Sequence, residues 1–297
     1  MNTPSSVKGL IDARLRALQV DNRLSAWSLI ISFMGDAISP RGGLVSAAAV
    51  QALMARLGIG HGAVRTAVSR LSADGWIERQ REGRNSFYRL SPEVTQTVRA
   101  AEARIYASSS LLAAGTPMAL VLGAEDFGDK ARDHLEGLGA LPLGSRLALC
   151  FTPPQDLPAD LRPPAATLAT VSSVDPGAAS GERIAGARQW SDLETFRAAY
   201  GPILAVLEED PVVSAEDAMA LRCLLIHEWR RIALKILPIP PALLLPDDPE
   251  PGARKLAATV YDRLKEPSEA WLDANASNLA GPLPPADFRF AERFHKA

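Results

Sequence analysis

Arginines are concentrated in residues 58–90, which read GIGHGAVRTAVSRLSADGWIERQREGRNSFYRL. They fall on a predicted helix and on the predicted hairpin that follows it. Guanidinium groups can donate paired hydrogen bonds to guanine edges and can hold phosphate oxygens. Small and hydroxyl-bearing side chains beside them allow a close approach to a duplex. The residues placed to make such contacts are Arg65, Thr66, Ser69, Arg70, Arg79, Arg81 and Arg84. The pattern therefore predicts contacts with DNA, and it assigns no catalytic residue.

The first of these arginines lie on a helix that the sequence predicts over residues 61–74. The residues at the i, i+4, i+7 spacing of a core-facing stripe are Val64, Val68 and Leu71. Small side chains fall on the opposite side, which Arg65 and Arg70 flank. Such a face can approach base edges while the arginines reach guanine or phosphate. For the helix taken alone, an ordinary solvated face is the alternative interpretation.

A hairpin is predicted over residues 76–90, with Glu82 and Gly83 at its tip because glycine supplies the positive φ of a tight turn. In that register Arg81 and Arg84 face each other. Like charges opposed across strands destabilise a hairpin, and a DNA phosphate between them would remove that cost. The helices predicted before this segment span residues 25–39 and 46–57. Helices followed by a basic hairpin are typical of a winged helix-turn-helix.

Charge is unevenly spread along the 297 residues. Residues 1–92 hold 12 Lys and Arg against 6 Asp and Glu, whereas the rest of the chain holds 20 against 28. This segregation fits an N-terminal domain that binds DNA and a remainder of the chain that does not. A chance segregation of charge is the alternative interpretation. A hydrophobic content of 47% supports a packed core.

Cysteine usage and hydropathy argue against several other classes of protein. Cys150 and Cys223 lie far apart and no C-x-x-C occurs, so a cysteine-based zinc site is not expected. Both thiols are expected to be reduced in a cytoplasm. No signal peptide opens the sequence, and no run of about 18 apolar residues indicates a membrane span. We therefore expect a cytoplasmic protein without a membrane partner.

Strand and helix patterns alternate in the middle of the chain. Strands are predicted over residues 118–123, 145–151 and 168–174, with a helix over 126–137 after the first of them. This order suggests a small α+β sandwich of the ferredoxin-like kind. The Gly-, Ala- and Ser-rich residues 175–189 are expected to form a loop.

The strongest helix is predicted over residues 214–237, where Ser214 is a favourable N-cap and Pro238 a stop. Apolar residues on most of its faces indicate burial between layers or in a subunit interface. A further helix is predicted over residues 252–265. The chain is thus predicted to be an α+β multidomain protein. Its predicted parts are an N-terminal arm or helix (1–24), a winged helix-turn-helix (25–92), a linker helix (93–115), a ferredoxin-like domain (116–189) and an all-α C-terminal domain (190–297).

Three motifs spread over most of the chain carry a family resemblance. They are GDAISPRGG (35–43), VRTAVSRLSADGWIERQREGRNSFYRL (64–90) and LRCLLIHEWRRIALKILPIPPALLLP (221–246). With them the chain resembles the phenylacetate-pathway repressor (PaaX) family. The resemblance implies a winged helix, a central ferredoxin-like domain similar to Cas2 proteins, and a helical C-terminal domain.

The resemblance also implies a function. Family members are homodimeric repressors of aromatic catabolic operons that bind double-stranded operator DNA. An aryl-CoA thioester such as phenylacetyl-CoA releases them, and no cofactor is implied. The DNA-reading role carries over to the matching positions, which are Arg65, Thr66, Ser69, Arg70, Arg81 and Arg84.

Two departures from the family pattern leave the effector open. The family usually has a tryptophan at the first strand of its central domain, where residues 116–118 read Thr-Pro-Met. It tends to have an Arg-Asp-Pro turn where residues 236–238 read Ile-Leu-Pro. An effector other than phenylacetyl-CoA, such as another aromatic acid or its CoA ester, is therefore plausible.

The candidate effector-binding residues lie in the HEWRR run at 227–231 and five residues before it. An acidic effector would meet Arg222, His227 or Arg230 there. The alternative is that His227 bonds a neighbouring carbonyl or carboxylate and that Arg230 and Arg231 form ion pairs across domains. A zincin site is not expected, because its second imidazole would have to stand at position 231, which is Arg.

Enzymatic alternatives have weaker support in the residues. A Cas2-like nuclease would need a metal-binding carboxylate after its first strand, where Asp126 lies without further ligands. An acyl-CoA-handling enzyme could also carry a winged helix as an interaction module, but no linear coenzyme A motif is present. A winged helix used only for protein contacts is the third alternative. No catalytic or metal-binding residue is assigned.

Overall fold

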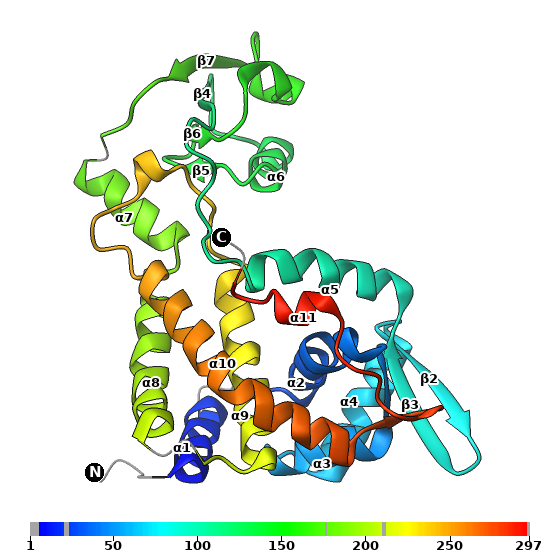
Figure 1. Ribbon diagram of the computed structural model, residues 1–297. Helices are drawn as coiled ribbons and strands as arrows, with labels where there is room; N and C mark the ends of the chain where they lie inside the picture. Colours follow the sequence, from blue (N-terminus) through cyan, green and yellow to red (C-terminus); the bar gives the residue numbers. More distant parts are fainter. Residues whose placement is uncertain (1–5, 21–23, 176, 210–211, 296–297) are drawn as a thin grey trace. The chain divides into compact units, whose positions relative to one another are not determined.

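The computed structural model describes residues 6–20, 24–175, 177–209 and 212–295, and these residues form two compact units (Figure 1). The first unit holds the chain up to Ser108, Thr195–Leu234, and the residues from Gly252. The second holds Ser109–Glu194 and Lys235–Pro251. The predicted winged helix and most of the predicted C-terminal domain thus share one unit. Parts of the predicted arm, residues 1–5 and 21–23, lie outside the described residues.

The N-terminal part of the first unit is helical with a small antiparallel sheet. Its helices are α1 (Val7–Val20), α2 (Ala26–Phe33), α3 (Ala47–Arg56), α4 (His61–Ala73) and α5 (Pro92–Ile105). A π-helical turn, Met34–Ile38, and a 3-10 turn, Ser39–Arg41, continue α2. The strands β1 (Leu44–Ser46), β2 (Ile77–Glu82) and β3 (Asn85–Leu90) pair in the order β1-β3-β2.

Local sequence signals explain where these helices begin and end. The side chain of Ser46 accepts a hydrogen bond from the Ala49 amide, and that of Ser91 caps α5 in the same way. Gly58 follows α3 with a φ of 72°, which L side chains rarely adopt. Ser46 thus marks the start of α3 and Gly58 its end, and α4 begins three residues after this glycine.

The predicted tip of the hairpin is wrong by one residue. Glu82 pairs with Asn85 and Arg81 pairs with Ser86, so the two-residue loop consists of Gly83 and Arg84. Gly83 has a φ of 57°, and a glycine at the first central position suits a type II′ turn. Arg81 and Arg84 therefore do not face each other across the strands as predicted.

The C-terminal part of the first unit is built around one buried helix. Its elements are α8 (Trp190–Glu209, from Thr195), α9 (Ala215–Ala233), α10 (Glu250–Asn275, from Gly252), α11 (Phe288–Ala291) and the short strands β8 (Ser277–Asn278) and β9 (Gly281–Pro282). Ser214 caps α9 by accepting from the Asp217 amide. Helix α9 packs against α1, α2, α3 and α5, which explains why most of its faces are apolar.

Helix α10 is longer than predicted because it continues through Pro267. Proline removes one hydrogen bond from the helix interior. Leu264 before it and Leu272 after it are both fully buried, and Trp271 is nearly so. The burial of these apolar side chains on one helix face offsets the lost bond.

The second unit contains a four-stranded antiparallel sheet. Its elements are β4 (Met118–Gly123), α6 (Asp129–Gly137), β5 (Leu141–Pro142), β6 (Leu147–Cys150), β7 (Ala166–Val171) and α7 (Ala178–Ala187). The strands pair in the order β5-β6-β4-β7. Two 3-10 turns, Pro154–Asp156 and Ala159–Leu161, connect β6 to β7. The molecule is therefore of mixed α/β class with small antiparallel sheets.

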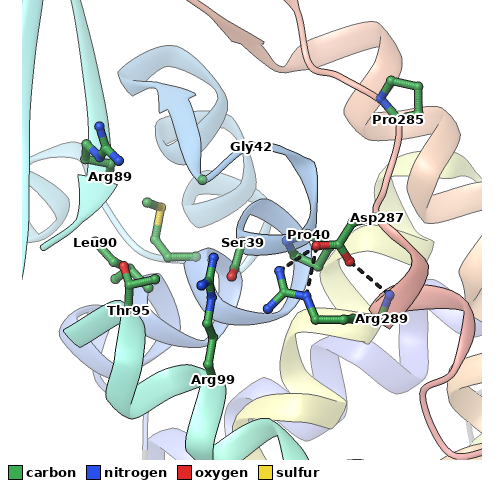
Figure 2. Close-up of a pocket in the computed structure, with 12 residues that line it drawn as sticks. Ser39, Pro40, Gly42, Arg89, Leu90, Thr95, Arg99, Pro285, Asp287 and Arg289 are labelled. Carbon is green, nitrogen blue, oxygen red and sulfur yellow. Dashed lines mark hydrogen bonds and ion pairs between the residues drawn. The ribbon is translucent and has the colours of Figure 1, made fainter. Parts of the chain in front are cut away.

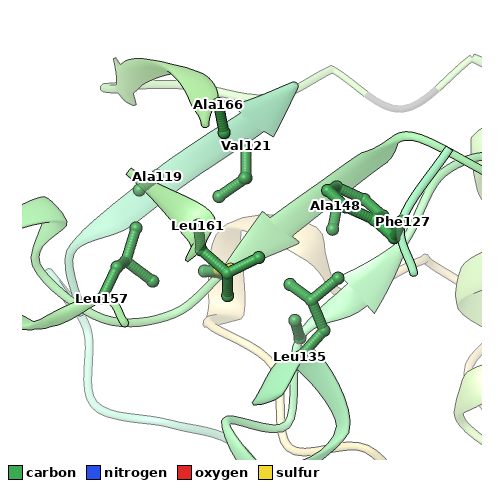
Figure 3. Packing of buried hydrophobic residues seen from close by; sticks show 10 residues of the cluster. Ala119, Val121, Phe127, Leu135, Ala148, Leu157, Leu161 and Ala166 are labelled. Carbon is green, nitrogen blue, oxygen red and sulfur yellow. The ribbon is translucent and has the colours of Figure 1, made fainter. Parts of the chain in front are cut away.

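Both faces of this sheet are covered. Ala119 and Val121 of β4 face a core that α6 closes with Leu135 (Figure 3). Met118 and Leu120 point to the other face, as the period of two in a strand requires. The predicted loop at 175–189 is wrong, because its residues from Ala178 form α7. Helix α7 covers that second face with the buried side chain of Ile184.

Two further observations bear on chemistry. No helix in the described residues is long and apolar enough to cross a membrane. Both cysteines are buried as free thiols, and burial raises the pKa of Cys150 to about 11 and raises that of Cys223 strongly.

The two thiols are therefore expected to be unreactive in the folded protein. The thiolate is the nucleophile, and burial both suppresses it and excludes reagent. At pH 8 the two thiols should react with Ellman's reagent, and produce its coloured product, only after the protein has been unfolded by denaturant. Reaction of either cysteine in the native protein at the rate of an exposed thiol would contradict this.

Candidate nucleic-acid interface

Helix α4 presents one apolar and one polar face. Val64 and Leu71 are fully buried and Val68 nearly so, which confirms the predicted inner stripe. The residues predicted to contact DNA from this helix are all exposed, and they are Arg65, Thr66, Ser69 and Arg70. The Thr66 hydroxyl donates to the carbonyl of Gly62 at 3.0 Å, so its oxygen can still accept a hydrogen bond.

The hairpin stands next to this helix in the first unit (Figure 1). Arg79, Arg81 and Arg84 are exposed on it. Arg79 donates from Nε and Nη2 to the Ser86 hydroxyl at 3.2 and 2.7 Å. Because Ser86 faces Arg81 across the strands, this contact fixes the Arg79 guanidinium along the hairpin.

An open hollow of about 600 Å³ lies between α3, α4 and the hairpin. It brings Arg65, Ser69 and Arg79 together, whereas the other predicted contact residues do not line it. Gln51 of α3 and His61 at the start of α4 also line it. Neither residue was predicted to contact DNA. Gln51 lies outside the buried stripe of Val50, Leu53 and Met54, and this spacing was the available signal.

Four of these arginines carry uncompensated charge. Among the residues that the structure describes, no hydrogen bond or ion pair engages the side chains of Arg65, Arg70, Arg81 and Arg84. Other arginines of the same unit form ion pairs. Arg41, for example, pairs with Glu269 at 3.0 Å and with Asp273 at 2.5 Å. The exposed side of α4 and the hairpin tip therefore hold free guanidinium donors that suit an anionic partner.

A buried charge cluster lies in the same unit. Asp36, in the π-helical turn, accepts from Arg222 at 2.7 Å, Arg293 at 2.9 Å, Tyr106 at 2.7 Å and Tyr261 at 2.9 Å. All five side chains are buried. Burial raises the pKa of Asp36, but the two arginines and the two hydroxyls lower it more, so its pKa lies below the ordinary value.

The three candidate effector residues on α9 are engaged inside the first unit. Arg222 also donates to Glu269 at 2.6 Å, and Arg230 donates to Ser32 and Ser28 hydroxyls at 2.8 and 2.6 Å. His227 is fully buried with Nδ1 3.4 Å from the Ser28 hydroxyl. Burial lowers the pKa of Arg230. None of the three lines the hollow described above, and their effector role stays a prediction.

The described residues contain no group of three or more His, Cys, Asp and Glu side chains that could hold a metal ion. Asp126, which a Cas2-like nuclease would need, accepts a hydrogen bond from the Ser145 hydroxyl at 2.6 Å.

Comparisons with known proteins cover most of the chain. Residues 25–94 match the family described as PaaX-like protein, and residues 187–274 match the family described as PaaX-like protein C-terminal domain. The chain is 30% identical over 290 residues to the transcriptional repressor PaaX of Escherichia coli (strain K12). The alignment covers 91% of this chain and 90% of that protein. A solved Mycobacterium tuberculosis protein of uncharacterized function aligns with a TM-score of 0.49 at 17% identity, over 83% of this chain and 98% of that one.

Proposed function

Because the chain belongs to the PaaX family, we propose that it is a DNA-binding transcriptional repressor that acts in the cytoplasm, and not an enzyme. The observation that carries the proposal is the set of four uncommitted arginines on the exposed side of α4 and the hairpin. Their free donors match the phosphates and guanine edges of a duplex.

In the proposed complex α4 enters the major groove and the hairpin lies along the neighbouring backbone. Arg65 or Arg70 reads guanine, while Thr66 and Ser69 allow the close approach. Arg79, Arg81 and Arg84 hold phosphates. The order of α2, α3, α4 and the sheet β1-β3-β2 supports a winged helix-turn-helix over residues 25–92.

We propose that the second unit is a ferredoxin-like domain. With β4, β5, β6 and β7 counted as first to fourth, the order β5-β6-β4-β7 becomes 2-3-1-4 with antiparallel neighbours, which is the ferredoxin-like order. The 3-10 turns between β6 and β7 stand where that fold has its second helix. The predicted domain division and the likeness to Cas2 are kept as part of this proposal.

The repressor is proposed to work as a homodimer on a roughly palindromic operator. Two copies of α4 would then lie about 34 Å apart, one turn of DNA. An effector releases DNA only if it favours a dimer geometry that no longer fits this spacing. The family resemblance of the sequence implies an aryl-CoA such as phenylacetyl-CoA, which is the first effector to test, with other aromatic acids or their CoA esters next.

Fluorescence anisotropy with a labelled fragment of the protein's own upstream DNA tests the proposal. We expect a dissociation constant of about 10 nM or lower, at least about a thousandfold below that for random DNA of equal length. Affinity should fall steeply with salt. Equal affinity for both DNAs would contradict the repressor function. Binding that ignores phenylacetyl-CoA would keep the repressor and remove that effector.

A further inference from the structure

A second hollow, of about 390 Å³, lies within the first unit at the base of the hairpin (Figure 2). Three stretches that are distant in sequence meet around it. They are the turn after α2 (39–43), the end of β3 with the first turns of α5 (89–99), and the C-terminal stretch 285–289. It is separate from the hollow beside α4 and from the three candidate effector residues on α9.

Uncommitted hydrogen-bond donors line this hollow. Within the described part of the chain, the guanidinium of Arg99 and the hydroxyls of Ser39 and Thr95 have no hydrogen-bond or ion-pair partner. Arg89 has a carboxylate partner, Glu78, but at 3.9 Å this contact is too long for a hydrogen bond. Two guanidinium groups and two hydroxyls are thus available to a ligand in this hollow.

The acidic residue in the wall does not oppose an anion. Asp287 accepts two hydrogen bonds from Arg289, at 2.9 and 2.5 Å, and Figure 2 shows Arg289 turned toward it. Its charge is therefore locally compensated. Arg289 is in turn taken up by this pair, which leaves Arg89 and Arg99 as the basic groups open to a ligand.

Part of the wall is apolar. Met34 and Leu90 are buried and reach the hollow, and Pro40 and Pro285 close it from the two other stretches. A volume of about 390 Å³ exceeds that of a bare phosphate and lies within the usual range of small-molecule sites. Apolar walls with a few convergent polar donors are typical of sites for small organic molecules.

We propose that this hollow binds a small organic anion. Its phosphate or carboxylate group meets Arg99, Arg89 and the hydroxyls of Ser39 and Thr95, and its apolar part lies against Leu90 and Pro285. Arg89 belongs to β3, the central strand of the hairpin sheet. The bound anion therefore ties the base of the hairpin to the C-terminal stretch and alters DNA binding, a consequence that rests on the proposed function.

Isothermal titration calorimetry on the full chain without DNA tests the site, with phenyl phosphate and inorganic phosphate as probes. Phenyl phosphate should bind saturably and at least about tenfold more tightly than inorganic phosphate, because its ring is buried. Arg99→Ala should weaken phenyl phosphate about tenfold or more, and Thr95→Val about fivefold. Arg263→Ala, an exposed arginine of α10 outside both hollows, should leave the affinity unchanged.

Each result decides a different point. No saturable binding, or equal affinity in Arg99→Ala and wild type, overturns the site. Equal binding of the two probes overturns the organic ligand and leaves a simple phosphate site. Adding phenyl phosphate to the anisotropy assay should shift the dissociation constant for upstream DNA at least about threefold in the wild type and not in Arg99→Ala. Binding without this shift overturns the regulatory consequence, whereas a failure to bind upstream DNA at all would overturn the proposed function instead.

Discussion

Replacing Asp36 by asparagine is expected to lower the free energy of unfolding by about 3–5 kcal/mol, because it removes one partner from a buried charge cluster. The substitution leaves the shape of the side chain almost unchanged. It takes away the negative charge that compensates Arg222 at 2.7 Å and Arg293 at 2.9 Å. Glu269 still pairs with Arg222 and Glu102 with Arg293, so the remaining charges are compensated only in part.

Urea titration followed by circular dichroism measures this loss. Asp262→Asn is the matched control, since Asp262 is exposed on α10 and the same chemical change there should cost less than about 0.5 kcal/mol. If the free energy of unfolding of Asp36→Asn lies within about 1 kcal/mol of the wild-type value, the cluster does not hold the first unit together.

The pH dependence of stability follows from the same cluster. The pKa of Asp36 is lowered in the folded protein, so its ionisation stabilises the fold above the unfolded value of about 3.9. This contribution is lost as the pH falls through the lower folded pKa. Wild type should therefore lose stability on acidification below about pH 4, and Asp36→Asn should lack that component of the loss. Parallel pH profiles for the two proteins would contradict the assignment.

The cluster also shows what a sequence pattern leaves open. Residue spacing predicted α9 with its Ser214 cap, and it predicted the strand at 118–123, because both signals are local. The partnership of Asp36 with Arg222 joins positions 186 residues apart, and no local pattern contains it. For this reason the winged helix and the C-terminal helices were predicted as separate domains, whereas the structure groups them in one unit.

Two predictions were wrong where the local sequence allows more than one structure. Gly83 could occupy either central position of a tight turn, and only the pairing of Glu82 with Asn85 decides between them. Residues 178–187 have weak helical signals, and α7 forms because Ile184 packs against the sheet of the second unit. In both cases tertiary packing, which the sequence does not display, selects between alternatives of similar local stability.

The candidate site was more predictable than the fold around it. The exposed side of α4 follows from helical periodicity, so Arg65, Ser69 and Arg70 could be placed from their spacing to Leu71. The hollow at the base of the hairpin could not, because its walls come from three distant stretches. Sequence reasoning is therefore strongest for a surface that one element presents and weakest for a cavity that several elements share.

The sharpest test of the interface compares two paired substitutions. Arg65→Ala with Arg70→Ala should reduce the preference for upstream over random DNA by about 1–3 kcal/mol for each guanine that is read, roughly tenfold or more in affinity ratio. Arg81→Ala with Arg84→Ala should weaken both DNAs by a similar factor, because phosphates carry no sequence. It should also reduce the slope of log affinity against log salt by about 1.8, for two lost phosphate contacts.

The comparison is decisive because all four arginines are exposed and lack partners within the described chain, so none of these substitutions breaks an internal contact. A loss of DNA binding then reports on the interface itself and not on folding, which circular dichroism melting should show to be unchanged. Arg263→Ala controls for the removal of one exposed positive charge from the same unit. If the α4 pair lowers affinity for both DNAs equally, α4 contacts phosphates and sequence is read elsewhere. If neither pair changes DNA binding, the arginines serve another partner, and the winged helix is a module for protein contacts.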